Sequence, residues 1–386
     1  MDVATSDLEV TVATAGDAAD VELDAFFETC PTSFAQQSRH WRDVITPLAG
    51  DQAQFLLCRA AGELVGVLPS YRYEGPLGAV LNSVPQPGPL GGVALAPGAP
   101  REAVYEALLT AYASLARDLG CAVASVISNP FWPDDALYRR FFDPEYTLEN
   151  SCLALDLEEE PDSEELPPGA SSHLRRNLRR ARSGALFIDD AQTRENVDEF
   201  VRIHEARHAE IGVHPLPRAL FSGALEHMTP ADKARFFFVR RASDDAMLAG
   251  GFYVHHAGVI DALMPAVASE DARLGANYLM ADHSIRWARE RGLRFYNWQG
   301  SPPTGGVARW KRQWGSREYR YAYFAKVTGD VEPFLRSTPQ DVLRDYRWHF
   351  VIPFDRIGCD DSSGDRNRGS GRSTRRAAWS SLETRR

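Results

Sequence analysis

One group of side chains has the spacing of a metal site. His204 and Glu205 are followed by His208 in an H-E-x-x-H pattern, and His214 comes six residues later. On a helix, His204 and His208 share a face and could bind Zn²⁺, with Glu205 as the general base of a hydrolase. The glycine that would turn the chain toward His214 is one residue late, at Gly212. The same segment also fits an ordinary helix that ends at this glycine, which is the interpretation we favour.

A second candidate is a lysine between two tryptophans. The chain reads Trp310-Lys311-Arg312-Gln313-Trp314-Gly315. An ammonium group in a dry pocket could stabilise the negative charge that develops on a carbonyl oxygen during acyl transfer. The alternative is a lysine at a strand end, whose stem packs on an aromatic ring while its charge stays in solvent. The residues alone leave both open.

Polar side chains interrupt an apolar stretch just before this lysine. Asn297 and Gln299 would lie on one face of a strand, with Trp298 on the other, because strand side chains alternate. The two amides could line an acceptor site or satisfy neighbouring backbone groups. Tyr296 and Tyr278 are candidates for protonating a leaving group, although tyrosines are more often packing residues.

Two further segments could bind anions. Gly275-Ala276-Asn277 begins a predicted helix, with Arg273 just before it, so backbone N–H groups could face a phosphate. A plain turn with a small residue for close packing explains the glycine equally well. The helix Leu174–Arg182 repeats arginine at i,i+4, as in Arg176 and Arg180, which is unfavourable without a nearby anion. A phosphate-bearing substrate or the acidic segment before this helix could supply that anion.

These residues are positioned by elements that occur twice. Leu115–Pro130 aligns without a gap to Trp287–Pro302 at an offset of 172, and each copy reads as a helix, a glycine and a buried strand. A hairpin precedes each copy, at Phe55–Tyr71 and at Phe236–His256. We therefore expect a duplicated α+β unit with mixed sheets flanked by helices, although chance similarity of two helix–strand crossings stays an alternative.

The breaks between these units are compositional. We expect an N-terminal domain over 1–157, an acidic, proline-containing linker over 158–172 and a C-terminal domain over 173–332. An extension would cover 333–359. The remaining residues, 360–386, are rich in Ser, Gly and Arg and too poor in apolar groups to fold, so we expect disorder there.

Composition excludes several classes of protein. The chain of 386 residues is 44% hydrophobic and 25% charged, which is ordinary for a globular protein. A net charge of −10 argues against DNA binding. The five cysteines form no C-x-x-C pair, and no apolar run is long enough to span a membrane. Without a recognisable secretion signal, we expect a cytoplasmic protein.

The segment Asn297–Tyr319 resembles the FemAB-like branch of the Gcn5-related N-acyltransferase (GNAT) superfamily, particularly in the K-x-x-W-G string from Lys311 to Gly315. Leu274–Leu279 and the arginine helix extend the resemblance. It implies two acyltransferase folds in tandem and transfer of an acyl or aminoacyl group to an amine. The donor would be an acyl-CoA, used as a co-substrate and not as a tightly bound cofactor, or an aminoacyl-tRNA. The superfamily's acyl-CoA loop is not matched, since Ala272 and Asn277 occupy key positions.

We therefore expect an acyltransferase in which a small-molecule or peptide amine attacks the donor carbonyl directly. Lys311 and Tyr296 are the predicted catalytic residues, and no bound metal is expected. The predicted donor-binding residues are Arg273, Gly275, Ala276 and Asn277. The predicted acceptor-binding residues are Asn297, Gln299, Trp314 and Arg176. A zinc hydrolase built on His204, Glu205 and His208, and a non-catalytic binding module, are the alternatives.

Overall fold

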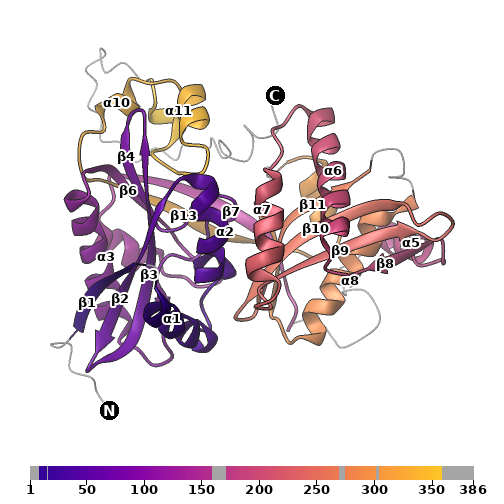
Figure 1. Cartoon of the computed structure of the whole chain (residues 1–386), viewed down its shortest axis with the longest axis horizontal. Coiled ribbons are helices and arrows are strands. Elements are labelled where there is room, and N and C mark those ends of the chain that lie inside the picture. Colours follow the sequence, from indigo (N-terminus) through magenta and orange to yellow (C-terminus); the bar gives the residue numbers. More distant parts are fainter. Residues whose placement is uncertain (1–7, 15, 159–170, 269–273, 301–303, 359–386) are drawn as a thin grey trace. The chain divides into compact units, whose positions relative to one another are not determined.

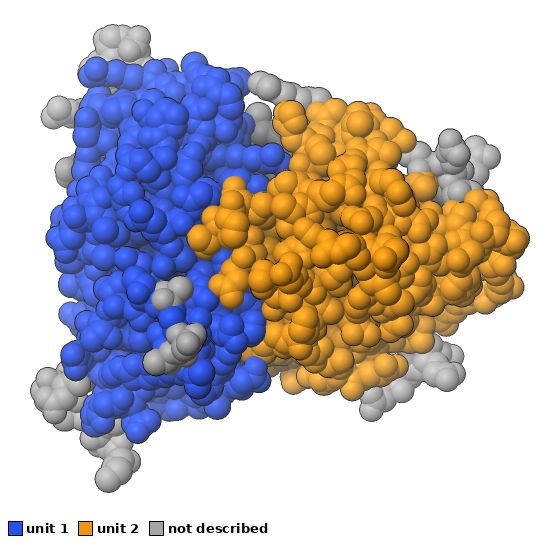
Figure 2. All heavy atoms as spheres, in the orientation of Figure 1, with its two compact units in different colours: residues 1–42, 49–150, 320–378 blue, residues 43–48, 151–319, 379–386 orange. Residues whose placement is uncertain are grey.

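The computed structural model describes residues 8–14, 16–158, 171–268, 274–300 and 304–358 (Figure 1). Two compact units share the chain (Figure 2). Unit 1 consists of Met1–Arg42, Ala49–Asn150 and Arg320–Ala378, and unit 2 of Asp43–Leu48, Ser151–Tyr319 and Trp379–Arg386. Most of the predicted linker (residues 159–170) and the predicted tail (360–386) lie outside the described residues.

Unit 1 is a mixed sheet with helices on both faces. Its own strands are β1 (Leu8–Thr14), β2 (Gln52–Ala60), β3 (Glu63–Gly75), β4 (Gly78–Asn82), β5 (Ala94–Leu95) and β6 (Cys121–Ile127). Its helices are α1 (Asp17–Thr29), part of α2 (Arg39–Ala49), α3 (Arg101–Asp118), α4 (Asp135–Leu137), α10 (Glu332–Leu335) and α11 (Pro339–Asp345). Alternation along β2 divides the core, because Leu56 and Cys58 pack toward α3 while Phe55 and Leu57 pack toward α1.

Unit 2 repeats this plan. Its strands are β8 (Leu186–Asp189), β9 (Ala234–Arg241), β10 (Met247–His256), β11 (Val259–Val267) and β12 (Phe295–Gly300). Its helices are α5 (Ser172–Ala181), α6 (Arg194–Ile211), α7 (Arg218–Gly223), α8 (Ala276–Glu290) and α9 (Gly306–Arg312). Helices α5 and α8 pack on the Phe237 face of β9, and Phe200 of α6 packs against Phe236 and Phe238 on the other face (Figure 1).

The strand that follows each sequence repeat completes the sheet of the unit that contains the other repeat. Strand β7 (Tyr146–Asp156) follows the first repeat, yet its second half pairs with β12 in unit 2. Strand β13 (Arg317–Val327) follows the second repeat and pairs with β6 in unit 1. The resulting orders, β13-β6-β4-β3-β2-β1 and β7-β12-β11-β10-β9-β8, match strand for strand, with the parallel pair at the same place in each.

The predicted helix–glycine–strand elements are present in both units. Helices α3 and α8 each end just before a glycine in the left-handed conformation, Gly120 with φ +66° and Gly292 with φ +68°. Such a glycine closes the last helical turn without the steric penalty that a Cβ atom would bring. The buried strands β6 and β12 then follow, and both predicted hairpins are present as β2–β3 and β9–β10.

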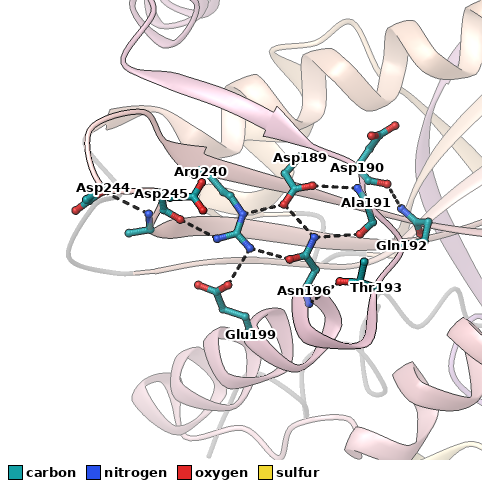
Figure 3. Close-up of polar contacts among 11 residues, drawn as sticks. Asp189, Asp190, Ala191, Gln192, Thr193, Asn196, Glu199, Arg240, Asp244 and Asp245 are labelled. Atoms are coloured by element: carbon teal, nitrogen blue, oxygen red, sulfur yellow. Dashed lines mark hydrogen bonds and ion pairs between the residues drawn. The ribbon is translucent and has the colours of Figure 1, made fainter.

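One buried arginine anchors the outer edge of the unit 2 sheet (Figure 3). Arg240 on β9 donates from Nε to Asp189 on β8 at 2.8 Å. Its other nitrogens donate to the carbonyl oxygen of Asp245 at 2.7 Å and to Asn196 and Glu199 on α6, each at 2.9 Å. The planar fork of the guanidinium therefore connects the short strand β8, the β9–β10 turn and the first turns of α6.

Candidate active site

The candidate site begins where the two parallel strands of unit 2 separate. Strands β11 and β12 pair over three positions, from Val259 opposite Phe295 to Asp261 opposite Asn297. On its other side, β12 pairs with β7, but the register breaks between Asn297 and Gly300. Gln299 adopts the left-handed conformation inside this break, with φ +62°. The bulge frees the carbonyl groups at the end of β12 from the regular strand ladder.

Lys311 uses these carbonyl groups. Its Nζ donates to the carbonyl oxygens of Trp298 at 2.6 Å, Gln299 at 3.3 Å and Gly300 at 3.4 Å. The residue lies on the short helix α9 and is 8% exposed. The alternative of a strand-end lysine with its charge in solvent is therefore wrong, because the short helix α9 presents Lys311 to the end of β12 and its charge lies inside the protein.

A cluster of aromatic rings adjoins Lys311. Trp310 and Trp314 flank Lys311 in sequence, and their rings lie 5.1 and 6.1 Å from the ring of Trp298. Tyr278 on α8 stacks against Trp314 at 6.5 Å. Burial lowers the pKa of Lys311 to about 8, since the charged form loses its hydration. The site therefore holds a cation that can lose its proton in a mildly alkaline solution.

A buried carboxylate organises the two predicted amides. Asp261 Oδ1 accepts hydrogen bonds from Asn297 Nδ2 at 2.6 Å and from Gln299 Nε2 at 2.7 Å. Asn297 Oδ1 in turn accepts from the backbone N–H of Gln299 at 3.0 Å, which fixes the bulge. Asp261 is 2% exposed, and sequence reasoning missed it. The available signal was an aspartate within the otherwise apolar run Val259–Val267.

Cys152 completes this cluster from β7, opposite Gly300. Burial raises the pKa of its thiol strongly; the charge of Asp261 adds to that effect and the charge of Lys311 opposes it. A thiol in this environment stays protonated and is a weak nucleophile. Cys152 is therefore poorly suited to form a covalent intermediate.

Four predicted residues are brought together here: Lys311, Asn297, Gln299 and Trp314. Tyr296 is placed differently. Its hydroxyl lies 2.8 Å from Ser284 Oγ on α8, its side chain is fully buried, and burial raises its pKa well above the usual value. Hydrogen bonding within the core accounts for this hydroxyl, so its role as a proton donor stays a prediction.

The predicted donor-binding segment lies at the start of α8. Gly275 has φ +86°, and a Cβ atom there would be 3.4 Å from the Cβ of Ala181 at the end of α5. Gly275 and Ala276 are buried, Asn277 is half-buried, and Arg273 lies outside the described residues. The left-handed backbone conformation of Gly275 accounts for the glycine, and donor binding at this segment stays a prediction.

Arg176 lies on the exposed face of α5, and its Nη2 is 3.0 Å from His173 Nδ1. Helix α5 packs through Leu174, Leu178 and Ala181, so its arginines face outward. Arg182 at the end of the helix pairs with the buried Asp282 of α8 at 2.5 Å. Among the described residues no contact joins Arg176 to the Lys311 cluster.

The zinc alternative is wrong in its geometry. His204 is fully buried, and its Nε2 accepts a hydrogen bond from the backbone N–H of Leu216 at 2.9 Å. Burial, together with the smaller effect of the neighbouring His208, lowers its pKa to about 3. Glu205 pairs with Arg218 at 2.9 Å. The helix ends at Gly212 as predicted, and no cluster of three potential ligands occurs in the described part of the chain.

A comparison with protein families matches the part of the chain that contains most of the Lys311 cluster. Residues 170–312 match the family model described as an acetyltransferase (GNAT) domain, which includes β12, α9 and Lys311. No curated protein sequence matches the chain. Within the described residues, no helix has the length and apolar character needed to cross a membrane.

Solved structures share the fold over most of the chain. FemX is 13% identical, with a TM-score of 0.65 over 81% of this chain and 97% of its own. The C-terminal domain of a putative lysylphosphatidylglycerol synthetase from Agrobacterium fabrum is 13% identical, with a TM-score of 0.56 over 85% of this chain and 98% of its own. L-PGS from Bacillus licheniformis is 12% identical, with a TM-score of 0.52 over 81% and 92%. The expected tandem α+β fold is confirmed.

Proposed function

We propose that this chain, whose residues 170–312 match the acetyltransferase (GNAT) domain model, transfers an acyl or aminoacyl group to an amine at the Lys311 cluster of unit 2. The observation that carries the proposal is the buried ammonium of Lys311, held by carbonyl groups at the bulged end of β12. A fixed cation in a water-poor site is suited to a reaction in which an oxygen atom gains negative charge.

The proposed reaction is a direct displacement. The neutral amine attacks the donor carbonyl, a C–N bond forms, and negative charge develops on the carbonyl oxygen. Collapse of this intermediate breaks the C–S bond of an acyl-CoA, or the C–O bond of an aminoacyl-tRNA, and the amine proton goes to the leaving group or to solvent. Lys311 stabilises the oxygen, whereas Asn297 and Gln299, oriented by Asp261, position the acceptor.

Acyl-CoA is our first choice of donor, as a co-substrate. Aminoacyl-tRNA is the second choice. We keep it because Gly275 and Ala276, in the segment predicted to bind the donor phosphates, are buried. One of the similar structures is named as a putative lysylphosphatidylglycerol synthetase, which is consistent with aminoacyl transfer on this fold. We assign contacts with a phosphate-bearing substrate to Arg176 and its neighbours, which lie on the exposed face of α5. The acceptor class is a small-molecule or peptide amine.

The test is an assay of thiol release with acetyl-CoA and a panel of amines, run in parallel with aminoacyl-tRNA transfer to the same amines. Mass spectrometry of the products identifies which amine gained an acyl or aminoacyl group. Product from either donor that depends on Lys311 supports the proposal. A folded protein that transfers neither group to any amine would favour the non-catalytic binding module.

A further inference from the structure

The candidate site of unit 2 has a structural counterpart in unit 1. In unit 1 the parallel strands are β4 and β6, and their pairing ends with Asn82 opposite Ser125. In unit 2 the corresponding pairing ends with Asp261 opposite Asn297. Ser125 and Asn297 are also equivalent in the sequence repeat, at the offset of 172. Repeat and register therefore identify Asn82 and Ser125 as the positions that match the cluster of unit 2.

In unit 1 these positions hold a piece of the chain itself. Asn82 Nδ2 donates to the carbonyl oxygen of Phe350 at 2.9 Å, and its Oδ1 accepts from the Phe350 N–H at 2.8 Å. The backbone N–H of Gln86 donates to the carbonyl oxygen of Trp348 at 2.8 Å. Residues 348–350 thus lie beside the segment that begins at the end of β4, and their backbone groups are hydrogen-bonded to it as those of an extended peptide ligand would be.

The side chains of this segment are buried on both sides. The ring of Phe350 is 2% exposed and lies 4.7 Å from the ring of Tyr323 on β13. His349 points the other way, with its Nε2 2.6 Å from Asp51 Oδ1 and its ring stacked on Tyr73 at 4.5 Å. His349 is 1% exposed, so the segment is fixed within unit 1.

Unit 1 also lacks the buried cation at the equivalent position. The repeat places Arg139 in the position of Lys311, on the helical turn Tyr138–Phe142 that follows β6 and α4. Arg139 is exposed, its guanidinium lies 5.4 Å from the ring of Phe324, and it contacts Glu149 at 3.8 Å. Neither of these contacts involves a carbonyl of β6, in contrast to the bonds between Lys311 and β12.

We infer that residues 348–350 are the resident occupant of the unit 1 counterpart of the active site, so that each chain binds one donor molecule, in unit 2. The inference rests on the proposed function for the location of the reaction. The segment stays bound throughout turnover at the point where β4 and β6 stop pairing. Unit 1 therefore serves as a scaffold and not as a second catalytic centre.

Hydrogen exchange measured by mass spectrometry on the full chain tests the occupancy. The peptide covering 346–352 should exchange slowly, and saturating CoA should not change its rate. Asn82→Ala should increase that rate at least tenfold while leaving the exchange of β12 and α9 unchanged, because the lost hydrogen bonds lie in unit 1. Asn82→Asp, which retains the acceptor for the Phe350 N–H, should give a smaller increase.

Calorimetric titration with CoA tests the stoichiometry. We expect one equivalent per chain in the wild type and in Asn82→Ala, with binding weakened by Lys311→Met. Two equivalents in the wild type, or a 346–352 peptide that exchanges as fast as an unstructured one, would overturn the inference. If no CoA binds, the acyl-CoA form of the proposed function fails, and the exchange of 346–352 still decides whether the segment occupies unit 1.

Discussion

A lysine ammonium buried among tryptophans is costly unless its N–H groups are bonded, because it gives up its hydration. Lys311 meets this requirement with carbonyl oxygens that a regular strand would have used in its own ladder. The bulge around Gln299 and the burial of Lys311 therefore depend on one another. The amides of Asn297 and Gln299, fixed on Asp261, maintain the bulge from the opposite side.

Replacing this lysine separates a catalytic role from a structural one. We expect Lys311→Met to reduce turnover about 10²–10³-fold, since loss of one group that stabilises a developing oxyanion has effects of this size. Methionine fills a similar apolar volume, so the near-ultraviolet circular dichroism of the aromatic cluster beside Lys311 should persist. Lys326→Met is the matched control, because Lys326 is bonded to Asp143 in unit 1. Equal turnover in both variants would contradict the assignment.

The pH dependence of turnover follows from the same residue. Burial lowers the pKa of Lys311 from the ordinary lysine value to about 8, so the folded protein loses this charge as the pH rises through that value. If the ammonium stabilises the intermediate, kcat falls above about pH 8. Lys311→Arg keeps its charge, and its alkaline limb should shift upward by at least one pH unit. A wild-type profile flat to pH 10 would show that the charge is not used.

At the scale of elements, the sequence predicted where helices and strands lie better than which of them contact one another. The glycines at 120 and 292 correctly mark the ends of α3 and α8, because a helix end is decided by a few neighbouring residues. The position of Lys311 on a helix, and the carboxylate of Asp261 beneath the amides, depend on contacts between elements distant in sequence. Composition and spacing carry no direct record of such contacts.

Arg240 illustrates how much an element can depend on one residue. Strand β8 has four residues and, among the described strands, pairs with β9 alone, so its attachment relies on the Asp189–Arg240 pair and on the bonds from Arg240 to α6 (Figure 3). We expect Arg240→Ala to lower the free energy of unfolding by about 1–3 kcal/mol, measured in urea, because the half-buried Asp189 and Glu199 lose their partner.

The neighbouring Arg241→Ala provides the control for this measurement. Arg241 pairs with Asp244 near the surface at the adjacent turn, and a pair of this kind contributes about 0–1 kcal/mol. Similar losses for the two variants would mean that the buried network has no special role. A loss confined to Arg240→Ala, with turnover retained, would show that this edge stabilises unit 2 without taking part in its chemistry.

At the scale of the whole molecule, the domains predicted along the sequence differ from the two compact units of the structure. The sequence repeat predicts domains over 1–157 and 173–332, which follow the chain. The units follow strand pairing, and the second half of β7 and most of β13 each complete the sheet of the unit that does not contain their own repeat. Periodicity gives the faces of a strand but not its neighbour, so this exchange was not foreseeable from the pattern.

The exchange makes a prediction about a chain cut once between the repeats. With a protease site placed within 159–170, cleavage gives one fragment that carries β7 and another that carries β13. Each unit needs a strand from the other fragment, so the two should co-elute in gel filtration under native conditions and separate in denaturant. Since β7 brings Cys152 and the partner of β12, the nicked protein should also keep most of its turnover. Fragments that separate without denaturant would show that each repeat folds independently of the exchanged strand.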